Sequence, residues 1–117
     1  MEPRQTSFVT PLGPNVRRRH EHVRIGKQVV SFAVQIEILW EGHWVPVVRY
    51  DTAHGFAHAD LLHPDGKTEK VPMRSTDFNE ALTLAQEDIN HHWEQYLKNY
   101  LMENKRWRKN PKLFTRT

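Results

Sequence analysis

The fold is decided by residues 29–40, VVSFAVQIEILW, in which apolar and polar residues alternate with a period of two. One face of this stretch carries Phe32, Val34, Ile36, Ile38 and Trp40, and the other carries Ser31, Ala33, Gln35 and Glu37. Such alternation, rich in β-branched residues, is typical of a strand with one buried face. It predicts a sheet that packs on a core with one side and leaves the other side exposed.

Three shorter strands are predicted after this one, at Trp44–Tyr50, Phe56–Leu62 and Thr68–Met73. Each is preceded by a turn signal that contains a glycine. Pro46 has no N–H to donate to a ladder, so we expect it at a sheet edge or a bulge. Connections this short predict a four-stranded antiparallel meander.

A long amphipathic helix is predicted from Phe78 onward. Asp77 and Glu80 have the spacing of a capping box, and no glycine or proline follows before Pro111. Apolar residues then recur in steps of three and four, at Phe78, Leu82, Ala85, Ile89, Trp93, Tyr96 and Tyr100. About 27 helical residues would span roughly 40 Å. The predicted fold class is α+β: a four-stranded antiparallel meander with one long C-terminal helix packed across one face.

The composition excludes several classes of protein. A chain of 117 residues fits one domain, and the absence of cysteine excludes disulfides, thiolate metal sites and a cysteine nucleophile. No apolar run approaches the roughly 20 residues that span a bilayer. Residues 1–10 lack the apolar core of a secretory signal, so we expect a cytoplasmic protein with no membrane contact.

Charge is unevenly distributed along the chain. Residues 1–28 hold six basic and two acidic residues, residues 104–117 hold six basic residues and no acid, and the net charge between them is −7. We therefore expect a basic, mobile N-terminal arm at 1–28, a single α+β domain at 29–104 and a basic C-terminal tail at 105–117. Basic ends on an acidic body suggest contact with RNA, another polyanion or an acidic protein.

The candidate nucleic-acid-binding residues lie in these basic ends. Trp107 stands among cations, and such an aromatic ring can stack on unpaired bases while the cations hold phosphates. The set comprises Arg17, Arg18, Arg19, Lys105, Arg106, Trp107, Arg108 and Lys109.

The densest polar cluster surrounds the turn between the second and third predicted strands. Its candidate catalytic residues are Arg49, Asp51, His54, His58 and Asp60. In strand geometry the first two share a face, and so do the last two. Whether both pairs share the same face depends on the register of the turn, which a shift of one residue inverts.

Three interpretations of this cluster remain open. In the first, a histidine transfers protons during phosphodiester chemistry while Arg49 stabilises charge on the phosphate. That chemistry needs no metal or cofactor, because the 2′-hydroxyl of RNA can act as the internal nucleophile. In the second, His54 and His58, with the carboxylates and His63, hold zinc or another transition metal. In the third, the residues form ordinary ion pairs at a turn.

The sequence from Arg49 to Asp60, RYDTAHGFAHAD, resembles the TumE-like proteins of prokaryotic toxin–antitoxin modules and related small prokaryotic proteins. The resemblance spans roughly residues 29–100. Asp60 stands where those proteins tend to have histidine. The matching residues are Arg49, Tyr50, Asp51, His54, Gly55 and His58. The resemblance implies a toxin that is neutralised by an antitoxin partner.

The sequence thus predicts a small toxin-like protein that acts on or binds RNA, with a metal-independent ribonuclease as one form of that activity. The expected partners are RNA or another polyanion and a cognate antitoxin-like protein. A homodimer through an exposed edge strand is a further expectation. The alternative is a non-enzymatic module that binds a partner protein or nucleic acid through its basic ends and its open sheet face.

Overall fold

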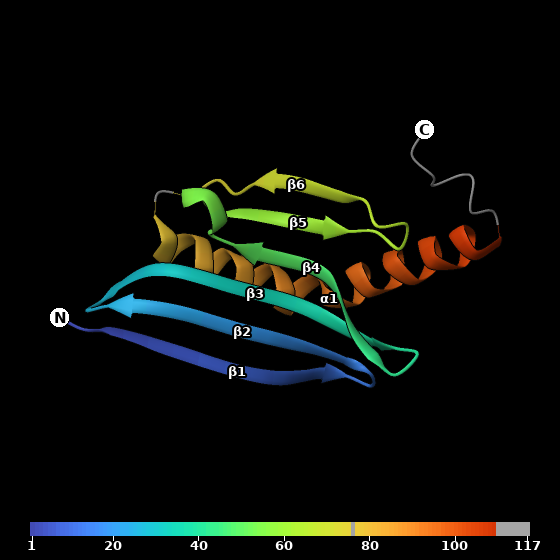
Figure 1. The fold of residues 1–117 in the computed structure, drawn as a ribbon, viewed down its shortest axis with the longest axis horizontal. Coiled ribbons are helices and arrows are strands. Elements are labelled where there is room, and N and C mark those ends of the chain that lie inside the picture. The colour runs from blue at the N-terminus through green and yellow to red at the C-terminus, as the bar shows by residue number, and fades with distance from the viewer. Residues whose placement is uncertain (76, 110–117) are drawn as a thin grey trace.

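The structure, a computed structural model, describes residues 1–75 and 77–109, apart from the side chains of residues 106–109. The described residues form one antiparallel sheet whose strands lie side by side in chain order, and one long helix (Figure 1). The elements are β1 (Pro3–Gly13), β2 (Val16–Ile25), β3 (Gln28–Trp40), β4 (His43–Asp51), the 3-10 helix η1 (Ala53–Gly55), β5 (His58–Leu62), β6 (Thr68–Pro72) and α1 (Phe78–Lys109). The α+β class and the antiparallel meander are confirmed.

The predicted number of strands is wrong, because the sheet has six strands rather than four. The two additional strands, β1 and β2, come from residues 1–28, which we expected to form a mobile arm. Gly13, at the end of β1, lies close to α1: a Cβ atom there would come within 2.9 Å of the Trp93 ring. The hairpin was missed because β1 is exposed along most of its length and β2 carries polar residues on both faces.

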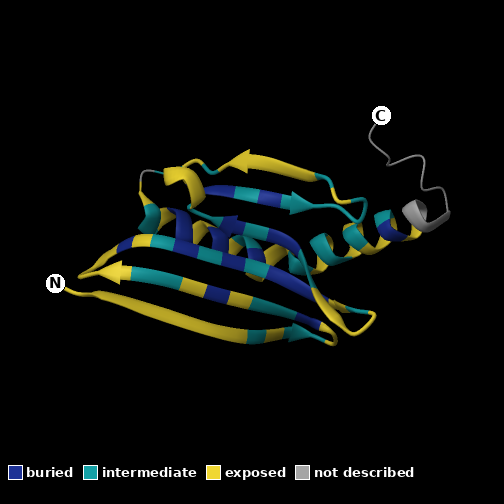
Figure 2. Cartoon of the chain, viewed as in Figure 1, coloured by how far each residue is buried: buried dark blue, intermediate teal, exposed yellow. Residues whose placement is uncertain are grey.

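The core lies between the sheet and α1, and β3 is its centre. Val34 and Ile36 of β3 and Ala85 and Ile89 of α1 have no solvent exposure. Figure 2 shows this buried band on the central strands and on the inward side of the helix, whereas β1 is exposed. Each fully buried aliphatic side chain contributes about 1.5–3 kcal/mol relative to exposure.

A bulge in β4 accommodates Pro46, as the sequence predicted. Ile36 pairs with Val48 and Glu37 pairs with Pro46, so Val47 is the extra residue on β4. Val47 and Val48 are both buried although they are adjacent, because the bulge interrupts the alternation of faces.

The helix α1 is fixed at its start by a cap and along its length by a polar contact to the sheet. The Asp77 carboxylate accepts a hydrogen bond from the Glu80 amide at 2.8 Å, which confirms the predicted N-cap. Asp88 accepts hydrogen bonds from the hydroxyls of Tyr50 on β4 and Tyr96 on α1. Burial and this carboxylate raise the pKa of Tyr50 and raise the pKa of Tyr96 to about 12. Both hydroxyls therefore stay protonated and donate.

The described part of the chain contains no helix whose length and apolar content together would let it cross a bilayer. The core residues of α1 form one stripe that faces the sheet, while Leu84, Leu101 and Met102 are exposed.

A buried histidine of β2, His20, contacts β1. His20 is almost fully buried, its ring stacks on Phe8 with centroids 4.4 Å apart, and its Nε2 lies 2.7 Å from Nδ1 of His22. Burial, the neighbouring His22 and Arg18 together lower the pKa of His20 to about 4. His20 is therefore neutral in the folded protein at pH 7.

Acid should destabilise the fold through His20. Its pKa is lower in the folded state than in the unfolded state, so the unfolded chain binds the extra proton, and stability falls as the pH drops from about 6.5 towards 4. His20→Phe keeps the ring stack and removes the titrating group. Urea unfolding at pH 7 and pH 4.5 should show that wild type loses about 2 kcal/mol more than the variant. Equal losses would contradict this assignment.

Candidate functional site

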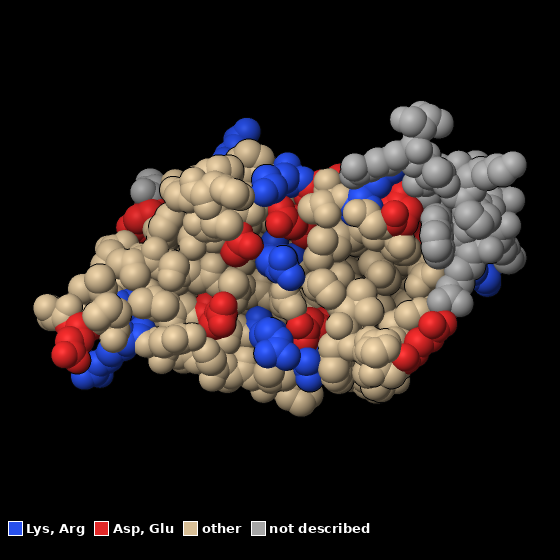
Figure 3. All heavy atoms as spheres, viewed as in Figure 1, with Lys and Arg blue, Asp and Glu red and all other residues tan. Residues whose placement is uncertain are grey.

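The charged residues of the central strands gather on the sheet face opposite α1, here called the open face. Arg49 pairs with Gln35 of β3 and with Asp60 of β5, and Asp51 pairs with His58. Directly paired residues point to the same side of a sheet, so both polar pairs of the turn cluster share the open face. Figure 3 shows positive and negative side chains alternating in a band across this face.

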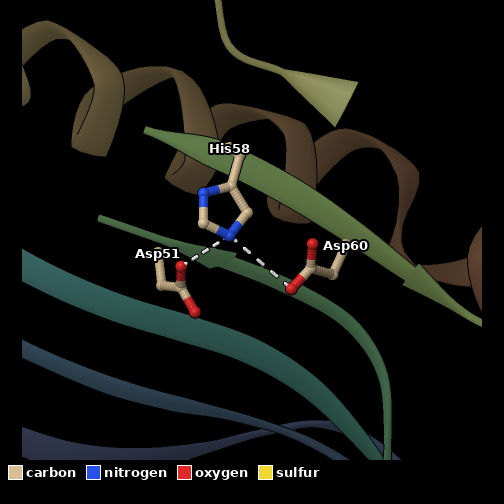
Figure 4. A group of neighbouring side chains, drawn as sticks. All are labelled: Asp51, His58 and Asp60. Carbon is tan, nitrogen blue, oxygen red and sulfur yellow. Dashed lines mark ion pairs between the residues drawn. The ribbon is translucent and has the colours of Figure 1, made fainter. Parts of the chain in front are cut away.

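Asp51, His58 and Asp60 form the centre of the cluster (Figure 4). His58 is only 1% exposed, and its Nε2 lies 2.8 Å from Asp51 Oδ1 and 3.7 Å from Asp60 Oδ2. On the other side of the ring, Nδ1 lies 3.3 Å from the carbonyl oxygen of Phe56. A carbonyl oxygen only accepts, so Nδ1 carries a hydrogen and donates it.

This geometry determines what each residue of the centre can do. Both nitrogens of His58 already face protein groups, so this ring orients Asp51 rather than meeting a substrate directly. Asp51 is only partly buried and is the member of the centre that solvent reaches best. Asp60 is 92% buried, and its Oδ1 has no hydrogen-bond partner among the described residues.

Next to this centre, the buried carboxylate of Glu37 organises an arginine network. It accepts hydrogen bonds from Arg17 Nε at 2.7 Å, from Arg19 Nε at 3.2 Å and from the Gln35 amide. The Gln35 amide oxygen in turn accepts from Arg49 Nε at 2.8 Å. Burial alone would raise the pKa of Glu37, but these donors outweigh it and lower that pKa, so Glu37 stays ionised.

The arginines and the centre meet at one shallow depression on the open face. Arg19, Arg49 and Asp51 line it together with Glu21, Ala33 and Gln35, and its volume is about 280 Å³. Arg49 donates from its Nε to the Gln35 amide oxygen, which holds its guanidinium at the depression. The depression therefore brings guanidinium groups together with the carboxylates of Glu21 and Asp51.

Exposed aromatic rings lie next to the charged groups. The Arg17 guanidinium lies 3.9 Å from the centre of the Trp44 ring, in a cation–π arrangement. The Phe56 ring lies 5.2 Å from that of His58. Both aromatic residues are exposed.

The structure separates the other predicted site residues. Alternation along β2 places Arg17 and Arg19 on the open face, while Arg18 points to the α1 side and donates to Asn90 at 3.0 Å. His54 is exposed on η1 with a positive φ of 68°. Lys105 is exposed on α1, and the side chains of the remaining predicted residues, Arg106, Trp107, Arg108 and Lys109, lie outside the described residues.

His63 does not join the cluster. Its Nδ1 lies 2.6 Å from Glu103 on α1, and its Nε2 lies 3.3 Å from Glu69 on β6. Burial of His63 opposes its protonation, but these carboxylates outweigh burial and raise its pKa. His63 therefore links the sheet to the helix.

Sequence reasoning missed Gln35, Glu37 and Trp44 as parts of the site. Gln35 and Glu37 lie on the polar face of β3. This position is the sequence signal that could have identified them as site residues. Their partners depend on the register between β2, β3 and β4, which the sequence does not specify.

A family model described as a domain of unknown function, DUF7718, matches residues 1–106. No curated protein and no solved structure matches the chain. The matched range includes the β1–β2 hairpin, in keeping with a sheet that continues from the hairpin into the meander. The match makes no connection with TumE-like toxins, so that resemblance stays a prediction.

Loss of the Glu37 charge should weaken the fold and release the arginines. Glu37→Gln leaves Arg17 and Arg19 without their buried carboxylate, and we expect a loss of about 1–3 kcal/mol in the free energy of unfolding. The matched control is Glu21→Gln. Glu21 is an exposed acid on the face of β2 that carries Arg17 and Arg19, and its replacement should change the free energy of unfolding by about 0.5 kcal/mol or less. Urea unfolding at pH 7 measures both. Equal effects would show that Glu37 does not hold the network together.

Proposed function

We propose that this chain, which belongs to the DUF7718 family, acts on RNA through the open face of its sheet. The observation that carries the proposal is the depression that Arg19, Arg49 and Asp51 line together. Guanidinium groups bind phosphate oxygens in a bidentate manner and stabilise charge that develops on them. The centre of Asp51, His58 and Asp60 lies directly beside this phosphate position.

The aromatic residues favour a single-stranded nucleic acid over a duplex as the ligand. Trp44 and Phe56 are exposed near the charged groups of the open face, where unpaired bases can stack on them. Stacking of this kind needs bases that are free of a duplex. A sheet with its helix on the opposite side leaves room for a single strand to lie across it.

The residues around the depression have different roles in this proposed activity. Arg49 holds a phosphate and is itself oriented by Gln35. Asp51 meets the substrate, and His58 orients Asp51. His54, exposed on η1 three residues after Asp51, is the histidine that can exchange protons with the substrate. The protein would act in this way in the cytoplasm, as the toxin-like component of a pair.

RNA binding should depend on Arg49 and on salt. Arg49→Ala removes a charged phosphate contact, so we expect affinity for a labelled single-stranded RNA to fall about tenfold. Asp51→Asn should abolish cleavage and preserve binding. The control Lys27→Ala removes an exposed charge at the turn between β2 and β3 and should change neither. Native and denaturing gels, run from about 50 to 200 mM salt, measure both activities. An RNA affinity that changes neither in Arg49→Ala nor with salt concentration would refute the proposal.

A second candidate function is supported by an apolar groove at the far half of α1. Trp93, Leu97, Leu101 and Met102 of α1 line it with Pro14 and Val16 of the hairpin, and its volume is about 560 Å³. The charged residues that line the groove are two lysines, Lys98 and Lys105, and one acid, Glu94. We propose an amphipathic helix with acidic flanks as its occupant, which an antitoxin-like partner would supply.

If the groove binds such a partner, a charged side chain placed in the groove should weaken the complex. Leu101→Glu places a carboxylate in the groove and should weaken a complex with a synthetic amphipathic helical peptide with acidic flanks at least tenfold. Leu84→Glu is the matched control, because Leu84 is 38% exposed, Leu101 is 39% exposed, and only Leu101 lines the groove. Titration calorimetry on the purified pair measures the affinities. Equal affinities for both variants would remove the groove from the interface.

A further inference from the structure

We propose that Asp51, His58 and Asp60 bind one divalent transition-metal ion of the Mn²⁺ or Zn²⁺ class. The role of this ion rests on the proposed action on RNA, but its binding can be measured without RNA. Two carboxylates and one imidazole form a ligand set that suits these ions.

The donor atoms are already close together. One ligand atom from each residue lies within 4.8 Å of the other two. Two donors that each lie about 2.0–2.2 Å from a tetrahedral ion are roughly 3.3–3.6 Å apart. The distances from His58 Nε2, 2.8 Å to Asp51 and 3.7 Å to Asp60, fall on either side of that spacing. Small side-chain movements would therefore complete the coordination.

The orientation of His58 suits metal binding. Its Nδ1–H donates to the Phe56 carbonyl, so Nε2 is the nitrogen that faces the two carboxylates. A hydrogen bond from the other ring nitrogen to a backbone carbonyl is the usual arrangement of a histidine that binds a metal.

A further observation on Asp60 points to the same position. Its side chain is 12% exposed, and its buried Oδ1 has no hydrogen-bond partner among the described residues. Leaving a buried carboxylate oxygen without a donor costs free energy, and such groups are usually paired or bound to a metal. A cation bound by both oxygens of the Asp60 carboxylate, of which Oδ2 lies 3.7 Å from His58 Nε2, would compensate this cost.

An ion at this centre would lie beside the depression that Arg49 lines. Three protein ligands leave coordination positions open for water and for a phosphate oxygen. A bound water that gives up a proton becomes a hydroxide nucleophile near neutral pH. The hydroxide would add to phosphorus, the bond to the leaving sugar oxygen would break, and that oxygen would take the proton that the water released.

Metal titration of the full chain tests the proposal. Calorimetry with Mn²⁺ and with Zn²⁺ on metal-free protein at pH 7 should show one equivalent bound. His58→Gln and Asp60→Asn should each weaken binding at least tenfold. His91→Gln, which removes an exposed histidine of α1, is the matched control and should bind as wild type does. Saturating Zn²⁺ should also raise the melting temperature of wild type, because the ion binds the folded state.

Two results would overturn the site: no binding by wild type, or equal binding by wild type and both variants. Circular dichroism shows whether each variant is folded. If His58→Gln is unfolded, Asp60→Asn decides, together with a Co²⁺ absorption spectrum of wild type. If the spectrum lacks the absorption bands of protein-bound Co²⁺, that result would also count against the site.

RNA assays with and without chelator separate this inference from the proposed function. RNA cleavage that chelator abolishes and added Mn²⁺ restores would support both. Metal binding by a protein that leaves RNA unbound would support the ion site and reject the function. Cleavage that persists in chelator, by a protein that binds no ion, would support the function and reject the ion site.

Discussion

The packing of one strand face against one helix is the constraint on which the rest of this structure depends. The apolar face of β3 lies on α1, and the most deeply buried side chains of the chain meet there. A two-layer fold has a single core, so covering one side of the sheet leaves the other side to water. The open face is therefore a direct consequence of how the core forms.

The open face is built from charges that compensate one another rather than from a basic patch. Glu37 is buried under Arg17 and Arg19, and Gln35 connects this group to Arg49. A buried carboxylate fixes the direction of flexible guanidinium groups more firmly than solvent would. The arginines are thus held ready for a ligand with two or more acceptor atoms, which is the chemistry of a phosphate group.

Much of the fold could be predicted from the sequence, because local patterns encode it. The alternation in residues 29–40 predicted β3, and Asp77 predicted the start of α1. The hairpin could not be predicted in the same way, because Arg17, Arg18 and Arg19 have the composition of a solvated charge run. Only pairing with β3 shows that consecutive arginines point to opposite faces.

The candidate site could be predicted by residue type but not by geometry. Arg49, Asp51, His58 and Asp60 stood out as a polar cluster, and the structure places all four on one face. Their common face depends on the loop through η1, where His54 and Gly55 both have positive φ. Glu37 was missed because a single acid in a strand gives no sign of its partners on neighbouring strands.

The position of α1 after all six strands has a consequence for how the protein is made. Strands emerge from a ribosome before the helix that covers them, so the apolar face of β3 must wait for residues synthesised much later. Until then the nascent sheet has a water-exposed apolar side and unpaired edges, which make partly folded chains prone to aggregate. The core can therefore form only once α1 is available.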